Sequence, residues 1–257
     1  MMKTKLLKSS GQLKYSGRTP VINVKILSQP DDVTCGPTSL HAVYSFYRDN
    51  ISLRQVIKEV SYLEEGGTLA VLLGKHALGR GYEAEIYTYN LKIFDPTWSG
   101  LTNTDILNKL NSQLAYKKGK KFEQATLAYM SFIKAGGIIR FKNLSTALLK
   151  DYFEQNIPVL AGLSSTYLYQ CAREYTGLND LTVYDDVRGY PSGHFVVLCG
   201  YDQHGKQIVV ADPYKANPIS SDQYYSVNIG RLINAIMLGI LTYDANLLII
   251  KPRKRKG

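Results

Sequence analysis

Apolar residues in the first half of the chain recur mainly at the three-to-four-residue spacing of an amphipathic helix. One such helix is predicted to begin at Cys35 and to run to about Tyr47, because Pro37 suits the first helical turn. Ser52 has the pattern of a capping residue and opens a second helix, with its apolar face at Val56, Val60 and Leu63. Further helices are predicted over residues 69–78, 104–114, 122–135 and 145–155.

The second half of the chain has more of the short apolar or alternating runs that are typical of strands. Residues 193–201 and 207–214 form two such runs, joined by a short turn-like segment. Other strands are predicted over residues 21–27, 84–89, 138–141, 157–163 and 246–251, and a helix over residues 226–240. Residues 167–188 are polar, rich in tyrosine and irregular, and we expect them to form a wall of a cleft.

Together these elements predict an α+β fold with a helical lobe and an antiparallel sheet lobe. The sequence has no linker and no internal repeat, so we expect one domain over residues 1–257. Residues 1–20 are expected to form a loose basic arm and residues 252–257 a basic tail.

Composition narrows the possible functions. The formal net charge of +10 is partly concentrated at the two ends, and no basic stretch is interleaved with aromatic residues, so nucleic-acid binding is not expected. Three cysteines without a Cys-x-x-Cys pair fit neither a disulfide scaffold nor a zinc ribbon, and no cofactor or metal is implied. No apolar run approaches a signal peptide or the roughly 20 residues of a membrane span. We therefore expect a cytoplasmic protein without a membrane span.

Cys35 is the strongest candidate for reactive chemistry. It stands at a predicted helix start, where the helix dipole favours a thiolate. Gln29 lies six residues upstream, and its side-chain amide is a candidate hydrogen-bond donor to an oxyanion. Cys171 and Cys199 lack this setting.

A base for this thiol is predicted from the far end of the chain. His194 stands at the start of one predicted strand, and Asp212 stands near the end of the next. In an antiparallel hairpin the start of the first strand lies beside the end of the second. We therefore predict that Asp212 lies next to His194 and orients its imidazole.

These motifs resemble those of the papain-like C39 and C39-like cysteine peptidases. The resemblance rests on the order Gln29, Cys35, His194 and Asp212, on the sequence Cys-Gly-Pro-Thr-Ser-Leu, on Gly-His-Phe-Val-Val and on Ala-Asp-Pro-Tyr. It implies that Cys35 is the nucleophile, His194 the general base and acid, Asp212 the orienting group and Gln29 the oxyanion donor. The sequence contains no transporter region of the kind that accompanies C39 domains proper, which favours the stand-alone C39-like group.

These features predict a cysteine-dependent amide hydrolase. We expect a thiol peptidase that acts on a peptide or small amide through an acyl-enzyme on Cys35. Two alternatives remain open at this point. The same site would serve an acyltransferase or transpeptidase if an amine replaced water, and the fold could also be kept as a non-catalytic peptide-binding module.

Overall fold

A computed structural model describes residues 21–64, 67–177, 181–202 and 206–253. The basic arm predicted over residues 1–20 and most of the predicted basic tail, residues 254–257, lie outside the described residues. Among the described residues, no helix has the length and apolar character needed to cross a membrane.

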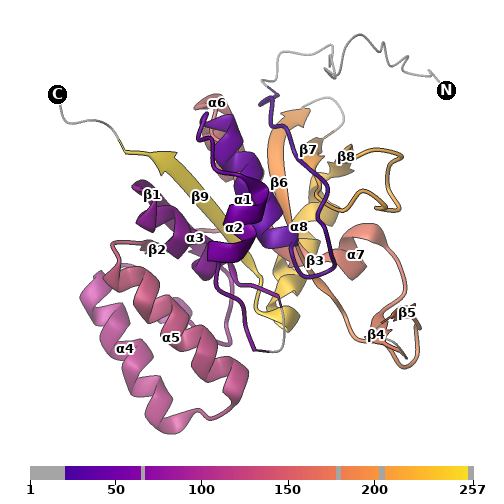
Figure 1. Cartoon of the computed structure of the whole chain (residues 1–257). Coiled ribbons are helices and arrows are strands. Elements are labelled where there is room, and N and C mark those ends of the chain that lie inside the picture. Colours follow the sequence, from indigo (N-terminus) through magenta and orange to yellow (C-terminus); the bar gives the residue numbers. More distant parts are fainter. Residues whose placement is uncertain (1–20, 65–66, 178–180, 203–205, 254–257) are drawn as a thin grey trace.

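The centre of the structure is a seven-stranded sheet with the strand order β2-β1-β9-β3-β6-β7-β8 (Figure 1). The strands β1 and β2 pair in parallel, and every other neighbouring pair is antiparallel. The strands are β1 (Tyr82–Thr88), β2 (Ile138–Arg140), β3 (Val159–Ser164), β6 (Gly193–Asp202), β7 (Gln207–Ala211), β8 (Tyr224–Asn228) and β9 (Asn246–Pro252). The α+β class is therefore confirmed, and the sheet is antiparallel apart from the pairing of β1 with β2.

Helices cover the sheet because its central strands are apolar on both faces. All six residues of β3 are buried, which requires cover on both sides. The helix α1 packs against β6, α3 packs against β1 and β9, and α8 packs against β3. The helices are α1 (Cys35–Phe46), α2 (Leu53–Glu59), α3 (Ala70–Gly79), α4 (Asn103–Tyr116), α5 (Lys120–Lys134), α6 (Thr146–Glu154), α7 (Ser165–Tyr169) and α8 (Ile229–Leu238).

Most predicted elements are present, but the segment predicted as a strand over residues 21–27 is not a strand. It is extended and buries Ile22, Val24 and Ile26 in alternation, which is the pattern that suggested a strand. Instead of pairing in the sheet, it crosses beside β6, β7 and β8 (Figure 1). The hydroxyl of Tyr224 accepts a hydrogen bond from the backbone N–H of Ile26 and donates one to the carbonyl of Val24.

Three further predictions need correction. The helix predicted over residues 226–240 starts later, because Tyr224–Asn228 is the edge strand β8 and the side chain of Asn228 caps α8. The helix after Ser52 ends at Glu59, so Leu63 lies beyond it. The segment 167–188 contains the end of α7 and a small hairpin of β4 (Glu174–Thr176) and β5 (Thr182–Tyr184).

Candidate active site

The thiol of Cys35 is placed by the start of α1. Cys35 is the first residue of this helix and is partly buried, and the residues from Gly36 to Tyr44 that follow it are all buried. The helix packs against β6, where the hydroxyl of Ser39 donates a 3.0 Å hydrogen bond to the carbonyl of Phe195. Because Phe195 follows His194, this bond fixes the helix that carries the thiol against the strand that carries the imidazole.

His194 and Asp212 come together through the β6–β7 hairpin, as predicted from the sequence. His194 is the second residue of β6, and Asp212 directly follows the last residue of β7. The ring nitrogen Nε2 of His194 lies 2.8 Å from Oδ1 of Asp212. Both side chains are buried, so water does not compete for this hydrogen bond.

The imidazole also reaches the thiol. Cys35 acts on His194 through its charge and through side-chain hydrogen bonding, and both effects raise the pKa of the imidazole. Since Nε2 is engaged by Asp212, the nitrogen left for the thiol is Nδ1. The geometry therefore forms a chain from Cys35 through His194 to Asp212, which is the arrangement of an activated nucleophile with an oriented base.

Electrostatics favours the charged forms of this pair. Burial acts to lower the pKa of His194, but the negative charges of Asp212 and Cys35 and the hydrogen bonds to both outweigh it and raise the pKa to about 10. Burial likewise acts to raise the pKa of Asp212, but the charge of His194 and the hydrogen bonds that the carboxylate accepts lower it. The site is therefore built to hold an imidazolium next to a carboxylate at neutral pH.

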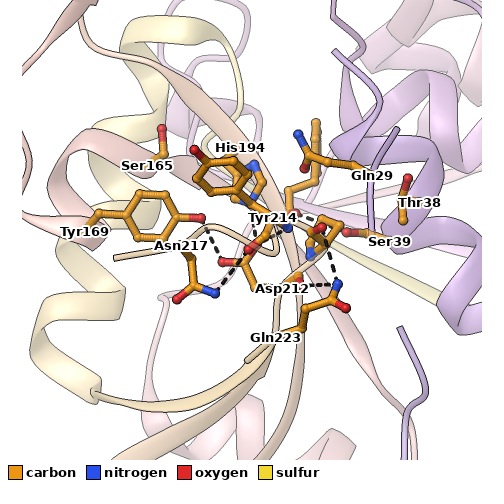
Figure 2. Close-up of polar contacts among 12 residues, drawn as sticks. Gln29, Thr38, Ser39, Ser165, Tyr169, His194, Asp212, Tyr214, Asn217 and Gln223 are labelled. Atoms are coloured by element: carbon orange, nitrogen blue, oxygen red, sulfur yellow. Dashed lines mark hydrogen bonds and ion pairs between the residues drawn. The ribbon is translucent and has the colours of Figure 1, made fainter. Parts of the chain in front are cut away.

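The carboxylate of Asp212 accepts hydrogen bonds from four groups. Oδ1 accepts from Nε2 of His194 and from the backbone N–H of Tyr214, each at 2.8 Å. Oδ2 accepts from the hydroxyls of Tyr169 at 2.8 Å and Tyr225 at 2.7 Å. Figure 2 shows the contact of Tyr169 with this carboxylate. Each carboxylate oxygen thus accepts two hydrogen bonds.

Gln29 lies near Asp212, and its side-chain amide donates a hydrogen bond within its own loop. Its backbone N–H donates to the carbonyl of Pro213 at 3.0 Å, which anchors the residue beside the end of β7. Its side-chain Nε2 donates to the carbonyl of Asp31 at 2.9 Å. Its Oε1 is buried and has no hydrogen-bond partner among the described residues. The amide nitrogen carries two hydrogens, so an oxyanion role requires its second N–H to face the thiol.

Sequence reasoning missed the tyrosines that surround Asp212. Tyr169 belongs to the short helix α7 and Tyr225 to the edge strand β8. Neither lies in a recognisable motif, and the chain holds 20 tyrosines, so composition does not single them out. The sequence signals were weak: Tyr169 lies in the tyrosine-rich segment 167–188 that was expected to form a wall of the cleft, and the last three residues of β8 were predicted as the start of a helix.

A second buried carboxyl group lies close to His194. The Oδ2 atom of Asp244 lies 2.6 Å from the position that a Cβ atom on Gly193 would take, and its Oδ1 has no partner among the described residues. Burial raises the pKa of Asp244 to about 8, although Lys121, Thr242 and His194 act in the opposite direction. Among the described residues, no group of three or more histidine, cysteine or acidic side chains is placed to hold a metal ion.

The chain is similar to known cysteine peptidases. A model of the Peptidase_C39-like family matches residues 21–231, which is more than half of the chain. No curated protein matches the chain.

Three solved structures are also similar. A protein described as a C39-like peptidase from Bacillus anthracis is 13% identical, with 93% of this chain and 100% of that chain covered and a TM-score of 0.46. A double glycine motif protease from an AMS/PCAT transporter, in complex with the leader peptide, is 17% identical, with 91% and 94% covered and a TM-score of 0.43. Xylellain, a cysteine protease from Xylella fastidiosa, is 12% identical, with 93% and 87% covered and a TM-score of 0.40.

Proposed function

The chain belongs to the Peptidase_C39-like family, and from this premise we propose that it is a cysteine-dependent amide hydrolase that cleaves a peptide or small amide. The observation that carries the proposal is the buried hydrogen bond between His194 and Asp212, together with the influence of Cys35 on the pKa of His194. Cys35 is only partly buried, whereas the base His194 and the carboxylate of Asp212 are buried.

The proposed reaction has two steps. The thiolate of Cys35 attacks the carbonyl carbon and forms a C–S bond. The imidazolium of His194 then gives its proton to the leaving nitrogen as the C–N bond breaks, which leaves an acyl-enzyme. In the second step His194 takes a proton from water, the resulting hydroxide attacks the acyl carbon, and the C–S bond breaks to release the acid. Asp212 holds the imidazole in one tautomer throughout.

The developing oxyanion needs hydrogen-bond donors. The first backbone N–H groups of a helix have no acceptor within the helix, so the N–H of Cys35 is one proposed donor. The amide of Gln29 is the other. Its Nε2 donates one hydrogen to the carbonyl of Asp31, and we infer that its second N–H is given to the oxyanion when a substrate is bound.

Selective alkylation tests the proposed nucleophile, with the other two cysteines as internal controls. Burial raises the pKa of Cys171, and burial raises that of Cys199 to about 12, so both are thiols at neutral pH. Iodoacetamide is applied from mildly acidic to mildly basic pH, and each cysteine is followed by peptide mass spectrometry. We expect Cys35 to be labelled first and already at acidic pH, because the thiolate is the reactive form.

Turnover is tested with a diverse peptide library, and the Cys35→Ala variant is the matched control. We expect cleavage products from the wild type only, together with a covalent acyl adduct on Cys35 in the intact mass. Labelling of Cys35 no faster than of Cys171 would refute the assembled nucleophile. Rapid labelling without any cleavage would instead favour the peptide-binding module, and transfer to an added amine would identify an acyltransferase.

A further inference from the structure

We propose that Tyr169 and Tyr225 are positioning residues that hold the carboxylate of Asp212 ionised and aimed at His194. This inference rests on the proposed function, since it assigns a role to two side chains around the same site. Neither tyrosine belongs to the set of residues that the sequence suggested.

The geometry divides the carboxylate into two halves. Oδ1 faces Nε2 of His194, and Oδ2 faces the two phenol hydroxyls at 2.8 and 2.7 Å. A carboxylate bound only through Oδ1 could rotate about its χ2 angle, which is a broad torsion. Donors fixed on Oδ2 remove that freedom, because any rotation would break hydrogen bonds at both oxygens.

The phenols also replace water. Asp212 has no solvent-exposed surface, and an ionised carboxylate without partners in such a place would take up a proton. The hydrogen bond from Tyr225 is among the causes that lower the pKa of Asp212. Hydrogen bonds to the charged form favour that form, so the tyrosines keep a negative charge available for His194.

The two hydroxyls are donors over the whole working pH range. Burial raises the pKa of Tyr225 well above its usual value, and the charge of Asp212 raises it further. Burial and the same charge raise the pKa of Tyr169. Both phenols therefore keep their protons while His194 and Asp212 titrate, and both remain hydrogen-bond donors to Asp212.

Tyr169 has a second contact that Tyr225 lacks. Its ring centre lies 6.0 Å from that of His194 and 6.3 Å from that of Tyr214. The helix α7 that carries it is tied to Ser192, two residues before His194. The N–H and hydroxyl of Ser165 both donate to the Ser192 carbonyl, and the Ser192 N–H donates to the hydroxyl of Thr166. Tyr169 therefore moves together with the strand end that presents the imidazole.

The pKa values of His194 and Asp212 depend on every group that faces these two side chains. Asp212 faces His194, Tyr169, Tyr225 and the backbone N–H of Tyr214. His194 faces Cys35 and Asp212, and the buried Asp244 also acts on it through charge. Removing a phenol hydroxyl changes one of these groups and leaves the others in place.

The test uses Tyr169→Phe, Tyr225→Phe and the double variant, with Tyr152→Phe as the matched control. Tyr152 and Tyr87 form another buried hydroxyl pair, 2.7 Å apart, so the control loses a comparable hydrogen bond away from His194 and Asp212. We expect the acid limb of Cys35 alkylation and of kcat/KM to move to higher pH by roughly one unit in the double variant. We also expect kcat to fall about tenfold per hydroxyl, with KM unchanged, because neither tyrosine is proposed to contact the substrate.

A titration that needs no turnover separates this inference from the proposed function. The ring nitrogens of His194 are followed by NMR in the wild type and the four variants. The pH of the transition caused by protonation of Asp212 should rise in both single variants and most in the double variant. An inactive wild type with these shifts would refute hydrolysis but support the positioning role. An unshifted titration in a folded Tyr169→Phe or Tyr225→Phe variant, or an equal shift in Tyr152→Phe, would overturn the positioning role.

Discussion

Gly193 is a position where a single added methyl group should disturb the site directly. It precedes His194 and pairs with Ser164 at the start of β6. A Cβ atom there would lie 2.6 Å from Oδ2 of Asp244 and 2.7 Å from Oγ1 of Thr242. Ordinary contacts of this kind begin at 3.4 Å, so alanine requires a separation of 3.4 − 2.6 = 0.8 Å.

The neighbours of Gly193 cannot easily make that space. Asp244 is buried and its backbone N–H donates to the carbonyl of Gly239, and the hydroxyl of Thr242 donates to the same carbonyl. The strain therefore falls on β6 and moves His194. Overpacking of this kind costs about 1–3 kcal/mol, or roughly 2–10 °C in Tm for a protein of this size. A displacement of the imidazole approaching 1 Å should reduce kcat/KM by up to about 100-fold.

Differential scanning calorimetry and Cys35 alkylation measure the two effects of Gly193→Ala. The matched control is Gly79→Ala at the end of α3, where an added Cβ meets nothing within 4 Å. Alanine is favoured over glycine in a helix by about 1 kcal/mol, so this control should be as stable as the wild type or more stable. A Gly193→Ala protein with unchanged Tm and unchanged alkylation would refute the argument that Asp244 and Thr242 hold this contact rigidly.

Three further predictions concern groups around the same site. In Asp212→Asn the charge that raises the pKa of His194 is lost, so kcat/KM should fall by roughly 10²–10⁴ and Cys35 alkylation at acidic pH should disappear. Burial raises the pKa of Asp244 to about 8, so the folded state holds this proton more tightly than the unfolded state. The stability of the wild type should therefore decrease as pH rises from about 4 to about 8. The Tm of Asp244→Asn minus that of the wild type should therefore increase between pH 5 and pH 9, and a constant difference would contradict the buried acid. Ser39→Ala loses the hydrogen bond to Phe195, so its free energy of unfolding should fall by about 1 kcal/mol and its Tm by about 2–4 °C. Alkylation of Cys35 should also be slower. Unchanged alkylation would show that this bond does not align α1 with β6.

The contact between His194 and Asp212 could be predicted from sequence because a hairpin is a local structure. Two apolar runs separated by a short turn leave few possible registers, and each register that buries both strands brings the start of one beside the end of the other. The start of α1 at Cys35 was predictable for a similar reason, since Pro37 fixes the first turn.

Other features depended on contacts that no local pattern encodes. Residues 21–27 alternate because one face is buried, and burial does not reveal whether the backbone pairs with a neighbouring strand. One backbone hydrogen bond joins Ile22 to Cys199 of β6, and the hydroxyl of Tyr224 binds the backbone of Val24 and Ile26. Tyr169 reaches Asp212 across 43 positions of sequence, so its role emerges only when α7 is placed in space.

The orientation of Gln29 could not be predicted from its spacing to Cys35. Spacing brings the residue near the thiol, but the direction of a side-chain amide depends on which acceptors lie within reach. Here the carbonyl of Asp31, two residues further on, is available and is used.

The place of β9 in the sheet has a consequence for how the protein is made. This strand is the latest in the described sequence, yet it lies between β1 and β3 and joins two halves of the sheet that no other strand pairing connects. During synthesis, the pair β1–β2 cannot join β3, β6, β7 and β8 in one sheet until residues 246–252 leave the ribosome. Such non-local pairing slows folding and exposes unpaired strand edges. A nascent chain stopped before residue 246 should therefore carry every residue of the candidate site and still lack the sheet that unites the two halves.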